Sequence, residues 1–335
     1  CVCVCVCVCV CVCVCLCGLR YRWTLILCLS RMIPLMAPKF HAARAVLRER
    51  KLKYEGIQRN TVPRVPSHST PELFEQFELW KGLIAYEREN AQRLVPMEFA
   101  KRVMHTYTQC LLSMYFFPEV WYDAAIFRTD YAGGEEGAQK MFERGIRATP
   151  DSLLLRLSMV GFLESKGNTD AVEKAFESMI KYFGQKKFRS EVERKHTTSI
   201  IFLQYMLFAR RSFGIDKARK IFMMARKNPD VTHHVYSASA LMEYHVSKDP
   251  KIARNIFELG MKKFLDVPAY AQKYISFLMH LNQDNNIRVL YERVLNRTTE
   301  RAAELAAQDE ENGEDAAKKY TNEVRCSLTS DRKHI

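Results

Sequence analysis

Cysteine and histidine are common metal ligands, and in this chain neither is arranged as metal sites usually are. Cysteine alternates with valine from Cys1 to Cys15, in a chain of 335 residues with twelve cysteines. Cys-x-Cys spacing can bind soft metals, but metal clusters interleave polar and basic residues rather than valine alone. His233 and His234 are adjacent, so on a helix they point about 100° apart, and no Cys or Asp lies at ligand spacing. We therefore predict no metal site.

Acid–base and phosphate-binding motifs are the next chemistry to consider. The chain has no glycine-rich phosphate loop, no His-Glu-x-x-His, and no Cys-x-x-Cys outside the opening run. Four glutamates, Glu143, Glu177, Glu258 and Glu292, recur at a regular interval. Because they recur, we interpret them as surface partners of neighbouring helices rather than as general acids. The sequence thus predicts no catalytic residue, no cofactor and no enzymatic activity.

Basic residues form two dense segments in a chain whose net charge is +13. The segment from Lys181 to Lys227 contains thirteen Lys and Arg residues and three acidic residues. The segment from Lys39 to Arg64 contains eight Lys and Arg residues and two acidic residues. Such clusters are typical of surfaces that bind RNA or an acidic partner, but a solvated helical face has the same composition. Both interpretations stay open. The candidate contacts in the first segment are Lys186, Lys187, Arg189, Arg194, Lys195, Arg210 and Arg211.

Aromatic residues are interleaved with the basic ones in "KHTTSIIFLQYMLFARR", as they are in many RNA-binding proteins. Phe202, Tyr205 and Phe208 lie at helical spacing, however, so we expect them in a core where they cannot stack on bases. Direct RNA binding by this segment would then depend on its cations alone.

The elements that position these residues follow from an internal repeat. Aromatic residues that open a charged helical turn are spaced by 35, 34, 46, 35 and 34 residues, from Tyr107 to Tyr291. Twenty-one residues before each of the last five lies a large apolar residue. Turn signals such as "AGGEEG", "SKGN" and "SKDP" lie between the two positions. Each unit of about 34 residues is therefore predicted to be a helix, a turn and a second helix.

A single helix pair cannot bury its apolar stripe, whereas stacked pairs bury a continuous core. The predicted fold class is thus all-α, an α-solenoid of tetratricopeptide-like repeats. Bulky aromatics in the first helix and Phe/Tyr-Glu-Arg endings in the second are typical of the half-a-tetratricopeptide (HAT) variant. The predicted structural anchors are Trp80, Tyr107, Trp121, Phe142, Phe176, Phe222, Tyr236, Phe257, Tyr270 and Tyr291.

Several strings are more specific than a generic repeat, among them "QYMLFARR", "HHVYSASALMEY" and "HLNQDNNIRVLYERVL". With these the chain resembles the suppressor of forked, or cleavage stimulation factor subunit 3, family, from about Asn60 to Leu295. The resemblance implies a nuclear scaffold in cleavage and polyadenylation of pre-mRNA whose second HAT half forms a homodimer. It also implies contacts with other subunits of the same factor and with the poly(A)-specificity complex, with pre-mRNA bound indirectly. Two alternatives are an RNA-binding solenoid that uses residues 181–227, and a splicing-associated HAT protein.

The resemblance and the composition together predict the domain organisation. The opening run could be a metal or disulfide cluster, a membrane or signal segment, or a translated TGTG repeat, and we favour the last. The predicted segments are 1–37, the opening run with an apolar stretch; 38–59, the end of a preceding helical half; 60–77, a Pro-rich linker; 78–297, the solenoid; and 298–335, a polar tail, frayed or disordered.

Four departures from the family pattern accompany this organisation. Most of the first HAT half is missing, a basic insert occupies residues 183–198, and the tail replaces further repeats, so we expect a fragment of a longer chain. The family's Pro-rich tail is also missing, so the partner binding attributed to that tail is not carried over. Only Cys110 and Cys326 follow Cys28, which indicates a reducing compartment and fits the nucleus. After the opening run no stretch is long and apolar enough to cross a membrane.

Overall fold

The computed structural model describes residues 20–65, 70–131, 134–308, 318–322 and 324, and the regular structure of these residues is helical, without strands. The predicted all-α fold class is confirmed. The chain divides into two compact units, residues 1–162 and 163–335. The alternating run from Cys1 to Cys15 and most of the predicted tail lie outside the described residues.

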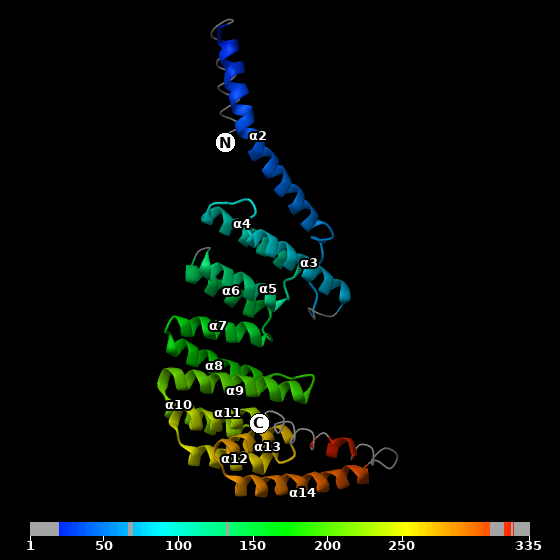
Figure 1. The fold of residues 1–335 in the computed structure, drawn as a ribbon, viewed down its shortest axis with the longest axis vertical. Helices are drawn as coiled ribbons and strands as arrows, with labels where there is room; N and C mark the ends of the chain where they lie inside the picture. Colours follow the sequence, from blue (N-terminus) through cyan, green and yellow to red (C-terminus); the bar gives the residue numbers. More distant parts are fainter. Residues whose placement is uncertain (1–19, 66–69, 132–133, 309–317, 323, 325–335) are drawn as a thin grey trace. The chain divides into compact units, whose positions relative to one another are not determined.

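The first unit begins with a long helix and continues with antiparallel helix pairs (Figure 1). Its helices are α2 (Arg20–Tyr54), α3 (Pro71–Arg88), α4 (Pro96–Ser113), α5 (Pro118–Asp130), α6 (Gly134–Ala148) and α7 (Leu153–Ser165), within which the division between the units falls. Helix α3 packs on α4, and α5 packs on α6.

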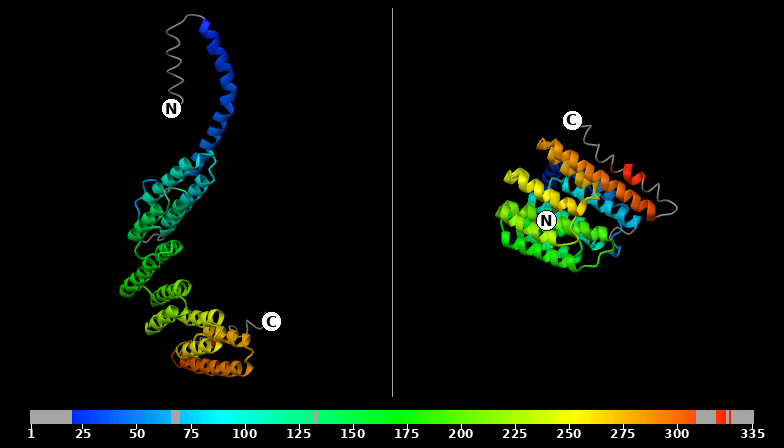
Figure 2. Two further views of the ribbon diagram at one scale, coloured as in Figure 1. Left: turned by 90° about the vertical axis from the view of Figure 1, so that its left-hand side faces the viewer. Right: turned by 90° about the horizontal axis from the view of Figure 1, so that it is seen from below.

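The second unit repeats the pairing, and Figure 2 shows its helices side by side from two further directions. Helices α9 and α10, α11 and α12, and α13 and α14 form its pairs. The bounds are α8 (Thr169–Gln185), α9 (Glu191–Phe213), α10 (Ile215–Lys227), α11 (His233–Met242), the π-helix η1 (Glu243–Ser247), α12 (Pro250–Phe264), α13 (Pro268–His280) and α14 (Asp284–Gln308).

Proline and side-chain caps explain where many of these helices begin. Helices α3, α4, α5, α12 and α13 each start with proline, whose fixed φ suits the first turn and whose missing N–H costs nothing there. Thr70 accepts a hydrogen bond from the backbone N–H of Leu73 at the start of α3. Asp249 accepts from two backbone N–H groups at the start of α12.

Three predicted domain boundaries fall inside helices. Helix α2 begins at Arg20, before the predicted boundary at residue 38. The cap at Thr70 starts α3 at Pro71, within the segment 60–77 that was predicted as a linker. Helix α14 continues through residue 297 to Gln308. Among the helices of the described residues, none has both the length and the apolar character needed to cross a membrane.

Candidate interaction surfaces

The basic segment from Lys181 to Lys227 spans the end of α8, a short loop, α9 and α10. The one long repeat spacing, 46 residues, arises here because the chain adds the Lys186–Ser190 loop and lengthens α9 to 23 residues. Ser190 caps α9 by accepting a hydrogen bond from the N–H of Val192. The predicted basic insert is thus the end of α8, a loop and the first turns of α9.

Three of the seven predicted cationic contacts pair with carboxylates of the same unit. Both oxygens of Glu164 accept from Arg211, at 2.7 and 2.8 Å. Arg194 lies 2.9 Å from Asp230, and Lys195 lies 2.7 Å from Glu191 one turn earlier. A bidentate arginine holds its partner in a fixed geometry, so much of this charge serves the fold rather than a ligand.

The other four predicted contacts are Lys186, Lys187, Arg189 and Arg210, and they differ in exposure. Lys187 and Arg189 are exposed in the loop before α9. Lys186 lies 5.0 Å from the ring centroid of Phe188 in a cation–π contact. Arg210 is half-buried near the end of α9. The structure therefore does not gather the seven cations into one site, and it leaves the loop as the most accessible part of them.

The aromatics of this segment belong to the core, as the sequence predicts. Phe202, Tyr205 and Phe208 are all buried. Tyr205 stacks on Phe176 of α8 with ring centroids 4.8 Å apart, and burial raises its pKa to about 12. A base could not reach these faces, so stacking on RNA is excluded for them.

Nine of the ten predicted anchors are buried, and the exception is Tyr291. Helix α14 turns Leu290, Val294 and Thr298 to the interior, four residues apart, which leaves Tyr291 half-buried beside that face. The repeat period thus places the helix correctly, but the buried face is offset from the predicted position by one residue, about 100° of helix rotation.

A small residue lies three positions after several of the anchor aromatics, and this repeat feature was not predicted from the sequence. Gly145 follows Phe142 and Gly260 follows Phe257 at this position, and both glycines are buried. A Cβ at Gly260 would collide with the Tyr270 hydroxyl, and one at Gly145 would lie 2.9 Å from the Trp121 Cβ. The signal was present, since Cys110 and Ala225 occupy the same position after Tyr107 and Phe222.

His233 and His234 have ring centroids 4.0 Å apart. Burial lowers the pKa of His233 to about 4, with further lowering by His234, Lys273 and His196. The described residues contain no group of three or more His, Cys, Asp or Glu side chains placed to hold a metal ion.

The repeated glutamates make unequal contacts. Glu258 fulfils the expected role, since it accepts from Tyr274 at 2.7 Å and pairs with Arg293 of α14 at 3.0 Å. Glu143 instead accepts a hydrogen bond from Gln139 one turn earlier in its own helix, at 3.0 Å.

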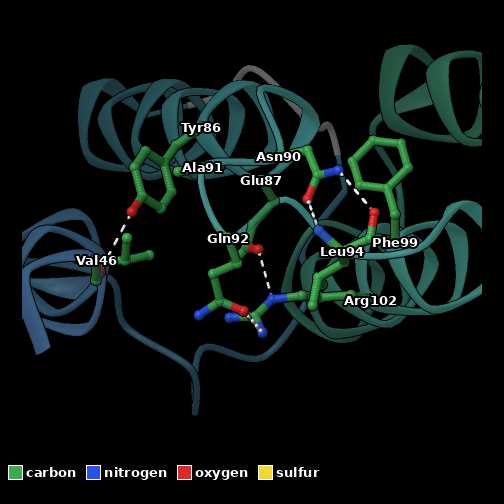
Figure 3. A pocket seen from close by; sticks show the side chains of 9 residues that line it. All are labelled: Val46, Tyr86, Glu87, Asn90, Ala91, Gln92, Leu94, Phe99 and Arg102. Atoms are coloured by element: carbon green, nitrogen blue, oxygen red, sulfur yellow. Dashed lines mark hydrogen bonds and ion pairs between the residues drawn. The ribbon is translucent and has the colours of Figure 1, made fainter. Parts of the chain in front are cut away.

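A buried carboxylate joins three helices of the first unit, and this junction was not predicted because its partners are distant along the chain. Glu87 of α3 accepts from Arg50 of α2 at 2.5 Å and from Arg102 of α4 at 2.8 Å. Figure 3 shows Glu87 and Gln92 both meeting the guanidinium of Arg102, and the Tyr86 hydroxyl donating to the carbonyl of Val46 in α2. The junction therefore fixes the end of α2 against the first helix pair.

Comparison with known proteins matches residues 28–309 to the model of the suppressor of forked protein family. The chain is 39% identical to cleavage stimulation factor subunit 77 of Arabidopsis thaliana over 258 residues, which cover 77% of this chain and 33% of the relative. It is 35% identical to protein suppressor of forked of Drosophila melanogaster, with coverage of 76% and 38%. The chain thus spans about a third of the length of these curated relatives.

A solved structure carries the same fold. The crystal structure of CstF-77 superimposes with a TM-score of 0.59 at 18% sequence identity, over 90% of this chain and 60% of that one. This likeness supports the predicted α-solenoid of HAT repeats.

Proposed function

The chain belongs to the suppressor of forked family, and from this membership we propose that it is a scaffold segment of the machinery for pre-mRNA 3′-end cleavage and polyadenylation. The observation that carries the proposal is the family match across residues 28–309, which spans both units. The names of relatives agree with it, since they include a cleavage stimulation factor subunit and an mRNA 3′-end-processing protein of Cryptococcus neoformans.

The proposed role is architectural and nuclear. Rigid helix pairs with aromatic cores present side chains in fixed positions, and partners can dock on them without large rearrangement. The partners we propose are a second copy of this chain, the other subunits of the cleavage stimulation factor and the poly(A)-specificity complex. Pre-mRNA would then be held mainly through those subunits.

The alternative of RNA binding through residues 181–227 is weakened by the ion pairs of Arg194, Lys195 and Arg211. The splicing-associated alternative is weakened by the names of the relatives, which refer to a cleavage stimulation factor and to mRNA 3′-end processing.

A competition experiment tests the scaffold proposal. The whole chain, added in excess to a nuclear extract, should pair with the resident full-length protein and reduce cleavage of a polyadenylation-signal RNA in proportion to its concentration. The control is the Tyr236→Ala/Tyr270→Ala double variant, which should not inhibit because both side chains are core residues. Full cleavage in the presence of a large excess of folded chain, with no resident subunit recovered on it, would contradict the proposal.

A further inference from the structure

We propose that the cleft between α2 and α4 in the first unit binds the phosphate backbone of single-stranded RNA. The cleft has a volume of about 660 Å³, within the range of sites that hold a ligand. The choice of RNA among polyanions rests on the proposed function, whereas the anion site itself rests on the geometry alone.

Positive charge dominates the lining. The four cations are Arg50, Lys51 and Arg59, from α2 and the loop after it, and Arg102 from α4. Among the described residues that line the cleft, none is acidic. Glu87 pairs with Arg50 and Arg102, so one carboxylate offsets only part of the charge of the four cations. An anion that enters can therefore gain further charge-assisted hydrogen bonds.

Two of the arginines are held in place before any ligand arrives. The side chains of Arg50 and Arg102 are only 26% and 25% exposed, and both donate through Nε to the Glu87 carboxylate, which is 5% exposed. Arg50 Nη2 also donates to the Tyr54 hydroxyl at 3.1 Å. A guanidinium carries five N–H groups, so these bonds leave further donors on each arginine for a phosphate. Side chains fixed in this way lose little entropy on binding.

Tyr54 organises the other side of the cleft. Its ring lies 4.5 Å from the guanidinium carbon of Arg59 and 5.1 Å from that of Arg50. Cation–π contacts to one ring hold both guanidiniums near the cleft although Arg59 itself lies in an exposed loop.

Two observations favour an RNA strand over a small anion. Gln109 also lines the cleft, and its Oε1 is buried without a donor among the described residues. If the amide of Gln109 rotates toward the cleft, a ribose 2′-hydroxyl beside a bound phosphate can donate to this oxygen. Arg44, Arg48 and Lys51 are exposed at a spacing of four and three residues on α2, so positive charge continues about 10 Å along one helix face.

The test measures binding of a fluorescent oligouridylate to the whole chain by anisotropy at low salt. The variant Lys51→Ala/Arg59→Ala removes two exposed cations of the cleft and keeps the Glu87 junction. Lys187→Ala/Arg189→Ala removes two exposed cations of the α8–α9 loop and is the matched control. We expect the cleft variant to bind at least about tenfold more weakly, with a salt slope smaller by about two, and the control to bind within about twofold of the unmodified chain.

A third variant tests whether the cleft recognises the ribose 2′-hydroxyl. Gln109→Leu should lower affinity for oligouridylate more than for the matched oligodeoxyuridylate. Absence of RNA binding by the unmodified chain, or an equal loss in the loop control, would overturn the proposal. Equal competition by polyglutamate of the same charge would overturn it in favour of an acidic protein partner. Because these measurements use purified chain, they can fail while the competition with resident subunits succeeds, and the reverse.

Discussion

The rings of Phe257 in α12 and Tyr274 in α13 are stacked, with centroids 4.9 Å apart and planes within 7° of parallel. Phe176 in α8 and Tyr205 in α9 make the same contact at 4.8 Å and 16°. Tyr274 donates its hydroxyl hydrogen bond to Glu258 of the preceding helix. Within the second unit, one helix pair is thus joined to the next by a repeated aromatic stack, a contact that contributes beyond simple burial.

Removing the anchors of the first helices should show how much the repeats depend on them. Tyr236→Ala and Tyr270→Ala should each lower the free energy of unfolding by about 3–5 kcal/mol, as large-to-small changes in cores do. Tyr270→Phe keeps the ring and loses only its hydrogen bond to the carbonyl of Phe257, so it should cost about 1 kcal/mol. Urea unfolding followed by circular dichroism measures all three. Unchanged unfolding midpoints for both alanine variants would contradict the repeat assignment.

The double variant Tyr236→Ala/Tyr270→Ala should lose more stability than either single variant. Typical domains are stable by about 5–15 kcal/mol, so the combined loss should leave the second unit largely unfolded.

Substitution of Gly260 tests whether packing requires a small residue three positions after the anchor Phe257. Ala in a helix is intrinsically better than Gly by about 1 kcal/mol. At Gly260 the added methyl would strike the buried Tyr270 hydroxyl, so Gly260→Ala should lower stability by about 1–3 kcal/mol. Gly184 of α8 has open space around it, and Gly184→Ala should be neutral or stabilising. Thermal unfolding of the two variants gives opposite shifts if the position is packed as described, and shifts of the same sign would refute it.

The sequence predicted the architecture better than it predicted the contacts. Spacing locates helix pairs because each pair must bury one apolar stripe, and the anchors follow from that rule. The same rule places Tyr291 in the interior, but it cannot say which face of a long helix such as α14 is turned inward. Local sequence also cannot show that Glu87 meets Arg50, 37 residues earlier, since only the packing of α2 on α3 brings them together.

Burial of His233 should make the second unit sensitive to mild acid. Its pKa is lowered from 6.5 to about 4, chiefly by burial and then by His234, Lys273 and His196. The unfolded chain therefore binds a proton between pH 6.5 and 4 that the folded chain does not, so stability falls as pH decreases through this window. His233→Phe removes the titration and keeps a ring against Tyr270 and Phe264. Unfolding midpoints from pH 7.5 to 4.5 should fall less steeply in the variant, and identical slopes would count against the assignment.

Residues 1–35 should be dispensable for folding. Among the described residues, the hydrogen bonds that join α2 to α3 are made beyond residue 35, by the Val46 carbonyl with Tyr86 and by Arg50 with Glu87. A chain that begins at Met36 should therefore keep its helical signal per residue and its unfolding midpoint. Circular dichroism and metal analysis check this. Loss of folding, or of stoichiometric zinc, on removal of the segment would contradict the interpretation of the opening run as a translated repeat.

We also expect residues 60–297 to self-associate. The contact should lie mainly on the last repeats, from Val235 to Leu295. Val289 and Leu295 of α14 are 56% and 37% exposed, and exposed apolar side chains on one helix are suited to an interface core. A two-fold dimer is the commonest closed assembly, and an obligate one should bury more than about 2,000 Å². Because such a core is apolar, raising the salt concentration should not dissociate it.

Light scattering across a dilution series tests this with two matched variants. Val289→Glu/Leu295→Glu places two charges in the expected contact and should yield monomer, while its helical signal stays unchanged because both positions are exposed. Met223→Glu/Met224→Glu makes the same kind of change on α10, outside the expected contact, at side chains 52% and 49% exposed, and should remain a dimer. Dissociation by the α10 change would move the interface there. A mass that rises with concentration would indicate open-ended stacking of repeats. A monomer at micromolar concentration for the unmodified chain would rule out the dimeric scaffold, because a contact that buries so much apolar surface persists under such dilution.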